Sequence, residues 1–319
     1  MSHELTARAD GSVEFAYLAS DGTPWHGLGQ ALEDGTSLDA WRTAAGMDWA
    51  IRRSAVRYNV TRGGENDSAG FIELPDQHVL FRSDTKAPLG VVSRKYQVVQ
   101  PGEVIEFFRD IARAGGLELS AAGTIYGGKR FWATAKIGES SPTSLRDTIG
   151  GYILISSSAD GSLATELRRT TVRAVCKNTL AMAFGDKATV KVSHRSVFDP
   201  AQVKDFMGLN TAAWDSFRAN VARLANAPVI QEEAEDILAK IFGGNETSGF
   251  KRTLGLFNGE GMGATLDGVM GTRWGLLNAV TEYADHHVRA RTDENRFVAS
   301  QWGAGADLKQ RALAALLPA

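Results

Sequence analysis

The segment 117–138 most constrains the fold, because two extended runs flank a short glycine turn. LELSAAGTIY precedes Gly127-Gly128, and KRFWATAKIG follows. Paired glycines are typical of two-residue β-hairpin turns, which need positive φ angles. A further β-rich run, GYILISSS, ends at the Asp160-Gly161 turn, and ELRRTTVRAVC follows it. Because these strands follow one another without intervening helices, they predict a mainly antiparallel sheet.

The preceding part of the chain predicts more strands and one early helix. Alternating apolar residues predict strands over 48–60, 78–82 and 89–93. Pro101 at the first position and glycines at the end predict a helix over 101–114. Residues 61–70, TRGGENDSAG, read as a turn or a flexible loop. Over residues 1–47 the sequence predicts an irregular N-terminal arm with short helical pieces, one of them over 37–45.

After about residue 198 the pattern becomes helical. Helices are predicted within 199–228, 229–244, 272–287 and 306–317. The domain organisation predicted is therefore an N-terminal arm over 1–47, an antiparallel β-sheet core with its helix over 48–198, and a helical region over 199–319. The fold class is α+β: a mainly antiparallel sheet with a β-hairpin and one early helix, followed by a C-terminal helical region.

Charge is distributed unevenly along a nearly neutral chain. The formal net charge is −2, yet residues 120–200 carry 11 Lys and Arg against 6 Asp and Glu. Residues 1–119 carry 12 against 17. A basic block beside an acidic one fits a polyanion-binding surface, a solvated sheet face, or a contact between subunits.

Composition limits the compartment and the chemistry. No apolar run approaches the roughly 18 residues that span a bilayer, and the first residues lack an apolar signal stretch. A cytoplasmic protein without a membrane partner is expected. A single cysteine, Cys176, excludes an intramolecular disulfide and a multi-cysteine zinc site.

The basic block contains the segment ELRRTTVRAVCKNTL, with cations at Arg168, Arg169, Arg173 and Lys177. Three β-branched residues over 170–172 favour a strand to about residue 176, followed by a short helix over 177–184. Arg169 and Arg173 share a face in a strand and in a helix alike. A cationic row is therefore expected in either geometry.

Two other clusters place cations beside aromatic rings. The first consists of the hairpin residues Lys129, Arg130, Phe131 and Trp132. The second is the group Arg94, Lys95 and Tyr96. A groove for single-stranded nucleic acid needs this combination, because phosphates contact cations and unstacked bases lie on rings. The alternative interpretation is that the aromatic residues belong to the core, beside a solvated turn.

Several stretches resemble a family of phage and plasmid proteins described mainly as a domain of unknown function. They are WHGLG at 25–29, LGVVSRKYQVVQP at 89–101, GGKRFWATAKI at 127–137, TVRAVCKNTL at 171–180, GTRWGLLNAVTEYADHH at 271–287 and LKQRAL at 308–313. The arrangement of sheet, helix and hairpin is more distantly similar to the phage single-strand annealing proteins of the RecT and Red-beta type. That resemblance implies rings or helical filaments that hold DNA in a basic groove and need neither nucleotide nor metal.

Catalytic chemistry finds little support in the sequence. Cys176 lies in an apolar run, which favours a small core residue over a nucleophile. His286 and His287 are adjacent, so on a helix they point about 100° apart and cannot ligate one metal as an i,i+4 pair would. The glycine-rich stretch 258–268 lacks the GK[ST] of a P-loop. No enzyme activity, no metal and no cofactor are predicted.

The leading hypothesis is an oligomeric, non-catalytic protein that binds and anneals single-stranded DNA in phage or plasmid recombination, in the host cytoplasm if a phage encodes it. Its expected partners are single-stranded DNA and further copies of itself, in a ring or filament. The cations of the 166–195 segment and of the hairpin would contact phosphates, and Phe131 or Trp132 would stack on bases. The alternative is a phage or plasmid assembly or regulatory protein that acts through protein–protein contacts.

Overall fold

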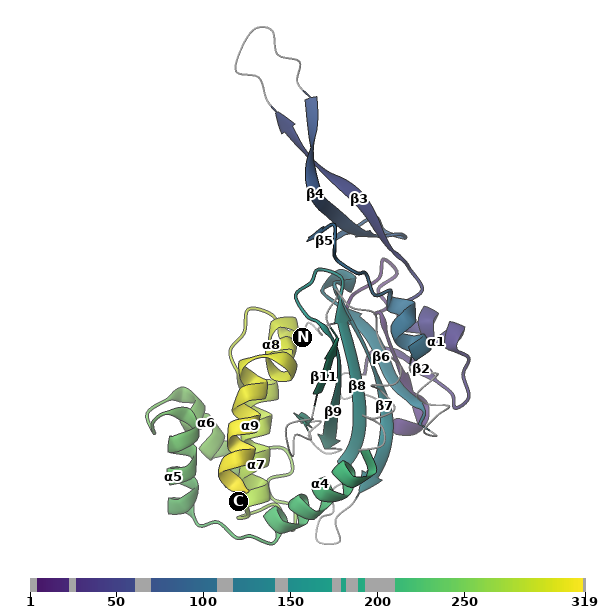
Figure 1. Ribbon diagram of the computed structural model, residues 1–319. Coiled ribbons are helices and arrows are strands. Elements are labelled where there is room, and N and C mark those ends of the chain that lie inside the picture. The colour runs from purple at the N-terminus through teal and green to yellow at the C-terminus, as the bar shows by residue number, and fades with distance from the viewer. Residues whose placement is uncertain are drawn as a thin grey trace.

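The computed structural model describes residues 5–22, 27–60, 70–107, 117–140, 149–173, 179–181, 189–192 and 210–317. A curved eight-stranded sheet forms the centre of this part of the chain (Figure 1). A three-stranded arm projects from one end of this main sheet. Helices pack against both faces of the main sheet. The mainly antiparallel α+β class predicted from the sequence is confirmed.

Four consecutive antiparallel strands make up most of the main sheet. They are β6 (Leu119–Ile125), β7 (Arg130–Ser140), β8 (Ile149–Ser158) and β9 (Thr165–Arg173). The hairpin predicted around the glycines is present between β6 and β7. Its turn has four residues, Tyr126 to Lys129, in place of the two predicted, because Ile125 pairs with Arg130. Three of them, Tyr126, Gly127 and Gly128, adopt positive φ angles, of 56°, 68° and 91°.

The second turn glycine is closely packed, whereas the first is open to solvent. A Cβ atom at Gly128 would lie 2.6 Å from Trp49 Cζ2, but one at Gly127 would have no atom within 4 Å. Gly128→Ala should therefore lower the free energy of unfolding by about 2–3 kcal/mol, through strain at positive φ and overpacking. Gly127→Ala should cost only the strain, about 1 kcal/mol. Urea denaturation of the two variants tests this, and equal losses would contradict the packing argument.

The edges of the main sheet differ from the sequence-based expectations. Within the predicted irregular arm, β1 (Phe15–Leu18) pairs with β6 and β2 (Gln30–Leu32) pairs in parallel with β1. Within the predicted short helix over 177–184, residues 179–181 instead form strand β10, which pairs with β9. β11 (Thr189–Val192) pairs with the same strand further along. The helix prediction was wrong because the open edge of β9 offers backbone partners that outweigh local propensity.

The projecting arm consists of β3 (Ile51–Val60), β4 (Gly70–Arg82) and β5 (Pro88–Ser93). β4 is 13 residues long, although the sequence predicted a strand only over 78–82. Pro75 and Asp76 interrupt the alternation there: Asp76 has a φ of 62°, and the register shifts between the pairs Ala55–His78 and Arg57–Glu73. A bulge of this kind interrupts the alternation of apolar and polar residues, so a search for period two does not detect the full strand.

Helices cover the two faces of the main sheet from different parts of the chain. On one face, α1 (Leu38–Ala44) and the helical residues 101–107 share a core with Phe131, Ala133 and Ile153. On the other, α8 (Asp293–Trp302) and α9 (Ala304–Leu316) approach β7 and β9. There the Trp132 and Phe297 ring centroids are 6.5 Å apart.

The C-terminal helical region has a second hydrophobic core, which also includes Ile149 of β8. It contains α4 (Asn210–Ala225), α5 (Gln231–Phe242), α6 (Ser248–Gly255) and α7 (Arg273–Glu282), besides α8 and α9. Trp214 of α4 attaches this core to the sheet, because a Cβ atom at Gly151 would lie 2.7 Å from its ring. Residues 199–209 of the first predicted helix and 108–114 of the early helix lie outside the described residues.

Candidate nucleic-acid interface

Three segments that are distant in sequence meet where the arm joins the main sheet. The Tyr96 hydroxyl donates to the Ser158 carbonyl at 2.8 Å, and Arg53 Nη2 donates to the Tyr96 carbonyl at 2.5 Å. The Ala159 amide donates to the Lys129 carbonyl at 2.8 Å. These bonds connect the start of β3, the turn 93–96 and the hairpin turn 126–130. We call this the junction surface; its polar and aromatic residues are Arg52, Arg53, Arg94, Lys95, Tyr96, Tyr126, Lys129 and Arg130.

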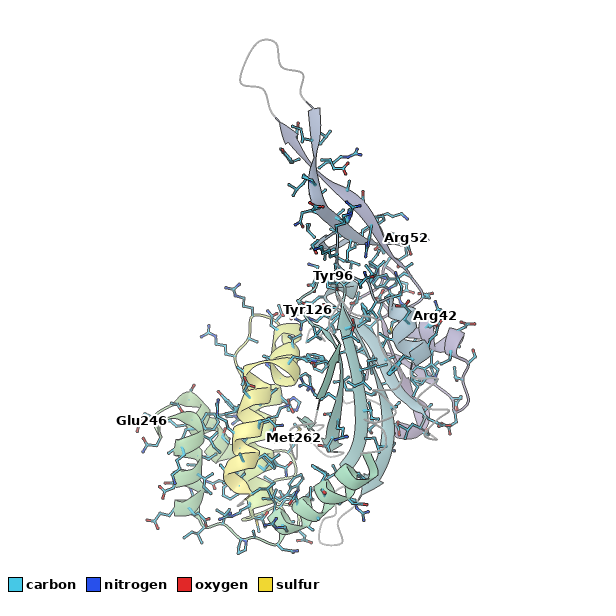
Figure 2. The ribbon with its side chains drawn as sticks, in the orientation of Figure 1. Arg42, Arg52, Tyr96, Tyr126, Glu246 and Met262 are labelled. Carbon is cyan, nitrogen blue, oxygen red and sulfur yellow. The ribbon has the colours of Figure 1, made fainter. Side chains whose placement is uncertain are left out.

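The junction surface is cationic and open to solvent. The exposed cations are Arg52, Arg53, Arg94, Lys95 and Lys129. Arg130 is half-buried; its guanidinium lies 5.7 Å from the centroid of the Tyr126 ring, and its Nε donates to Ser162 Oγ at 3.2 Å. Figure 2 labels Tyr96 and Tyr126 at the end of the main sheet from which the arm projects, and Arg52 at the base of the arm. Exposed cations from three segments and two tyrosines therefore lie at one end of the main sheet.

Both tyrosines are held in fixed positions. Burial, followed by the nearby charge of Asp160, raises the pKa of Tyr96 to about 12, so its hydroxyl remains a neutral donor. Tyr126 adopts a φ of 56°, a conformation unusual for a residue with a bulky side chain, and its hydroxyl donates to Asn295 Oδ1 at 2.7 Å. Rings fixed in this way lose little rotamer entropy when a planar ligand stacks on them.

An ion cluster of Arg82, Glu14 and Asp84 lies next to the junction surface. Arg82 donates to both carboxylate oxygens of Glu14, at 2.6 and 3.0 Å, and to both of Asp84, at 2.8 and 3.0 Å. Its guanidinium lies 4.2 Å from the centroid of the Trp49 ring. The hydrogen bond from Arg82 lowers the pKa of Asp84 to about 2. Burial lowers the pKa of Arg82, but its two carboxylate partners outweigh burial and raise it overall.

The structure places two members of the predicted cationic row of β9, Arg168 and Arg169, outside this surface. Arg168 Nη2 lies 3.0 Å from Glu166 Oε1, and its Nη1 donates to the Gln301 carbonyl, so it joins the sheet to α8. Arg169 is buried on the opposite face, beside the core, and burial lowers the pKa of its guanidinium. Both residues were predicted to contact phosphates, but in the structure they are packed as parts of the fold. The side chain of Arg173, together with Cys176 and Lys177, lies outside the described residues.

The aromatic residues of the hairpin also have structural positions. Phe131 is fully buried in the core that α1 also lines. Its ring therefore cannot stack on a base, contrary to the prediction. Trp132 is half-buried on the other face, with ring centroids 5.8 Å from Phe15 and 6.5 Å from Phe297. The core interpretation fits both rings better than base stacking does.

One residue of the second predicted cluster does share a contact with the hairpin cations, because Tyr96, Lys129 and Arg130 all bond to the 158–162 turn. The Arg94 amide instead donates to the Asp76 carbonyl of β4 at 2.9 Å. Sequence reasoning missed Arg52, Arg53 and Tyr126. Arg52 and Arg53 are adjacent in a predicted strand, so one of them lies on each face of it. This pattern could have been recognised in the sequence.

The discounted metal motif has other partners. Asp285 lies 2.7 Å from Lys309 Nζ, and Glu282 accepts from the Met262 amide at 2.9 Å. Burial lowers the pKa of His287, which lies 3.7 Å from Glu282. Over the ranges that the structure describes, no group of three metal-ligating side chains is found. Within the same ranges, none of the helices has the length and apolar character that a bilayer crossing requires.

The fold and the junction surface define an α+β protein with a cationic end. The chain belongs to the family described as Domain of unknown function (DUF932), whose model matches residues 88–302, about two thirds of the sequence. No curated protein and no solved structure matches the chain. The match does not extend to the annealing proteins, so that likeness stays an expectation from sequence motifs.

Proposed function

We propose that the protein binds single-stranded DNA at the junction surface and acts as a non-catalytic homo-oligomer in the annealing or recombination of phage or plasmid DNA. The observation that carries the proposal is the presence of five exposed cations, from three segments, at the end of the main sheet that also carries Tyr96 and Tyr126. No nucleotide or metal takes part in it.

The chemistry of the junction surface fits a flexible polyanion. Exposed cations neutralise phosphates and release counterions without reading the base sequence. Stacking on an aromatic ring contributes roughly 1–3 kcal/mol per base and tolerates every base. The two tyrosines replace Phe131 and Trp132 as the stacking residues, because their rings lie at the cationic surface.

Neutralising three junction cations tests the proposal. The triple variant Arg94→Gln, Lys95→Gln and Lys129→Gln should bind labelled oligo-dT about tenfold or more weakly at moderate salt. The slope of log affinity against log salt should also fall by about 2, at roughly 0.7 per phosphate contact. Fluorescence anisotropy at several salt concentrations measures both quantities, and sequence-independent losses are expected.

Two controls make the result specific. Arg218→Gln, Lys240→Gln and Lys251→Gln remove three cations from the helical region and should leave the slope unchanged. Arg169→Met should also leave the slope unchanged in whatever fraction remains folded, because that guanidinium is buried. An unaltered slope in the folded junction variant, or no binding by the wild type at low salt, would overturn the proposed site.

The second candidate function, assembly through protein–protein contacts, is favoured by a different observation. The arm exposes Tyr58, Phe71 and Ile72, which lie further along it than the junction cations Arg52 and Arg53. Protein contact by the arm is compatible with DNA binding at its base.

A further inference from the structure

The arm carries an unusual amount of exposed apolar surface. Five of the eight large apolar side chains exposed in the described residues lie on it, and Phe71 is the most open, with 73% of its surface exposed. The five are Tyr58, Phe71, Ile72, Leu74 and Val91. Contiguous exposed apolar side chains of this kind mark an interaction surface.

The distal half of the arm is suited to protein rather than to nucleic acid. Among the described residues 57–60 and 70–74, the charged side chains are Arg57 and Glu73, which face each other at 3.8 Å. Phosphate binding would need an excess of cations there. Tyr58 lies opposite Ile72 in the register, and Phe71 lies opposite the next residue, so apolar groups occupy both faces of the ribbon.

A second apolar site lies at the start of α5. The Val229 amide donates to the Gly271 carbonyl at 2.9 Å, and Pro228 forms an antiparallel bridge with Thr272. Ile230 and Met270 are each one residue away from the Val229–Gly271 hydrogen bond, on the two segments that it joins. Both side chains have 68% of their surface exposed. They are therefore two exposed apolar residues on the outside of the helical region, on either side of one hydrogen bond.

Acidic residues follow this apolar pair directly. The first two turns of α5 contain Glu232, Glu233, Glu235 and Asp236. Glu232 and Asp236 are exposed, whereas Glu233 is held by Arg273 at 2.6 Å. We call Ile230, Met270 and these four acids the acidic end. It combines exposed apolar side chains with negative charge.

The arm and the acidic end match each other in chemistry and lie at opposite ends of the molecule. The arm has apolar side chains distally and the cations Arg52 and Arg53 at its base. Figure 1 shows the arm projecting from one end of the main sheet, with α5 at the far side of the helical region. One chain cannot join its own two ends across the body, but two copies can.

We propose that the arm of one copy docks on the acidic end of the next, with Phe71 and Ile72 against Ile230 and Met270. The two surfaces differ, so the contact is heterologous and repeats into a ring or an open filament. This inference rests on the homo-oligomeric part of the proposed function. Because Arg52 and Arg53 also belong to the junction surface, the docking is tested through apolar residues outside that surface.

Complementation between two variants tests the docking. An arm variant, Phe71→Ser with Ile72→Thr, retains an intact acidic end. An acceptor variant, Ile230→Ser with Met270→Ser, retains an intact arm. Sedimentation velocity should show assembly of the wild type and a monomer of 34.3 kDa for each variant alone. An equimolar mixture should form a dimer of about twice that mass, because one intact arm meets one intact acidic end.

The other outcomes overturn the proposal in distinguishable ways. An acceptor variant that still assembles would indicate arm-to-arm contact, and a monomeric wild type at micromolar concentration would leave the arm to another protein. As a matched control, Met262→Ser removes an exposed apolar side chain outside both surfaces and should assemble normally. Both docking variants should retain the salt slope for oligo-dT, so loss of assembly and loss of DNA binding are measured separately.

Discussion

Arg82→Met should lower the free energy of unfolding by about 3–5 kcal/mol, because it leaves a buried carboxylate without its guanidinium. Glu14 and Arg82 are each 4% exposed, and two hydrogen bonds join them. The pair links the segment before β1 to the end of the arm strand β4, so its loss also loosens the base of the junction. Urea denaturation, followed by circular dichroism, measures the change.

A matched exposed pair provides the control. Arg57→Met removes the guanidinium that faces Glu73 at 3.8 Å, where both side chains are more than half exposed. The expected change is within about 0.5 kcal/mol, since water and salt screen such pairs. Adding Glu14→Leu to Arg82→Met should recover part of the loss, because no uncompensated charge remains buried. Equal losses for Arg82→Met and Arg57→Met would contradict the role assigned to burial.

The central strands could be predicted from the sequence because their signals are local. The Gly127-Gly128 turn and the Asp160-Gly161 turn determine which strands are neighbours, and alternation then determines which side chains share a face. Arg169 and Ile153 do lie opposite each other in the β8–β9 register. Alternation alone could not show that α1 and residues 101–107 bury this face.

The candidate site depended on contacts between distant segments, which sequence patterns do not contain. Arg94, Lys95 and Tyr96 were recognised as a cluster, and so were Lys129 and Arg130. The hydrogen bond that connects Tyr96 to the turn beside the hairpin, at Ser158, spans 62 positions of sequence. The length of strand β4 in the arm was underestimated for a different reason. The bulge at Pro75 and Asp76 interrupts the alternation by which strands are recognised.

The last prediction concerns the ion pair that joins α9 to the end of the α7 segment. Lys309 Nζ lies 2.7 Å from Asp285 Oδ1, with side-chain exposures of 4% and 7%. Lys309→Met keeps the apolar stem but leaves the carboxylate buried without that ammonium, so the free energy of unfolding should fall by about 3–5 kcal/mol. Because α9 packs beside α8 and α7, the loss should appear in the thermal melt of the whole helical region.

The exposed pair Lys251–Glu246 is separated by 2.6 Å, almost the same distance, so it isolates the effect of burial. Its side chains are 60% and 85% exposed, so Lys251→Met should leave the thermal melt unchanged, because water and salt screen the pair. The double variant Asp285→Asn with Lys309→Met should be more stable than Lys309→Met alone, since an amide is less costly to bury than a carboxylate. A double variant no more stable than the single one would show that Asp285 is not the group left uncompensated.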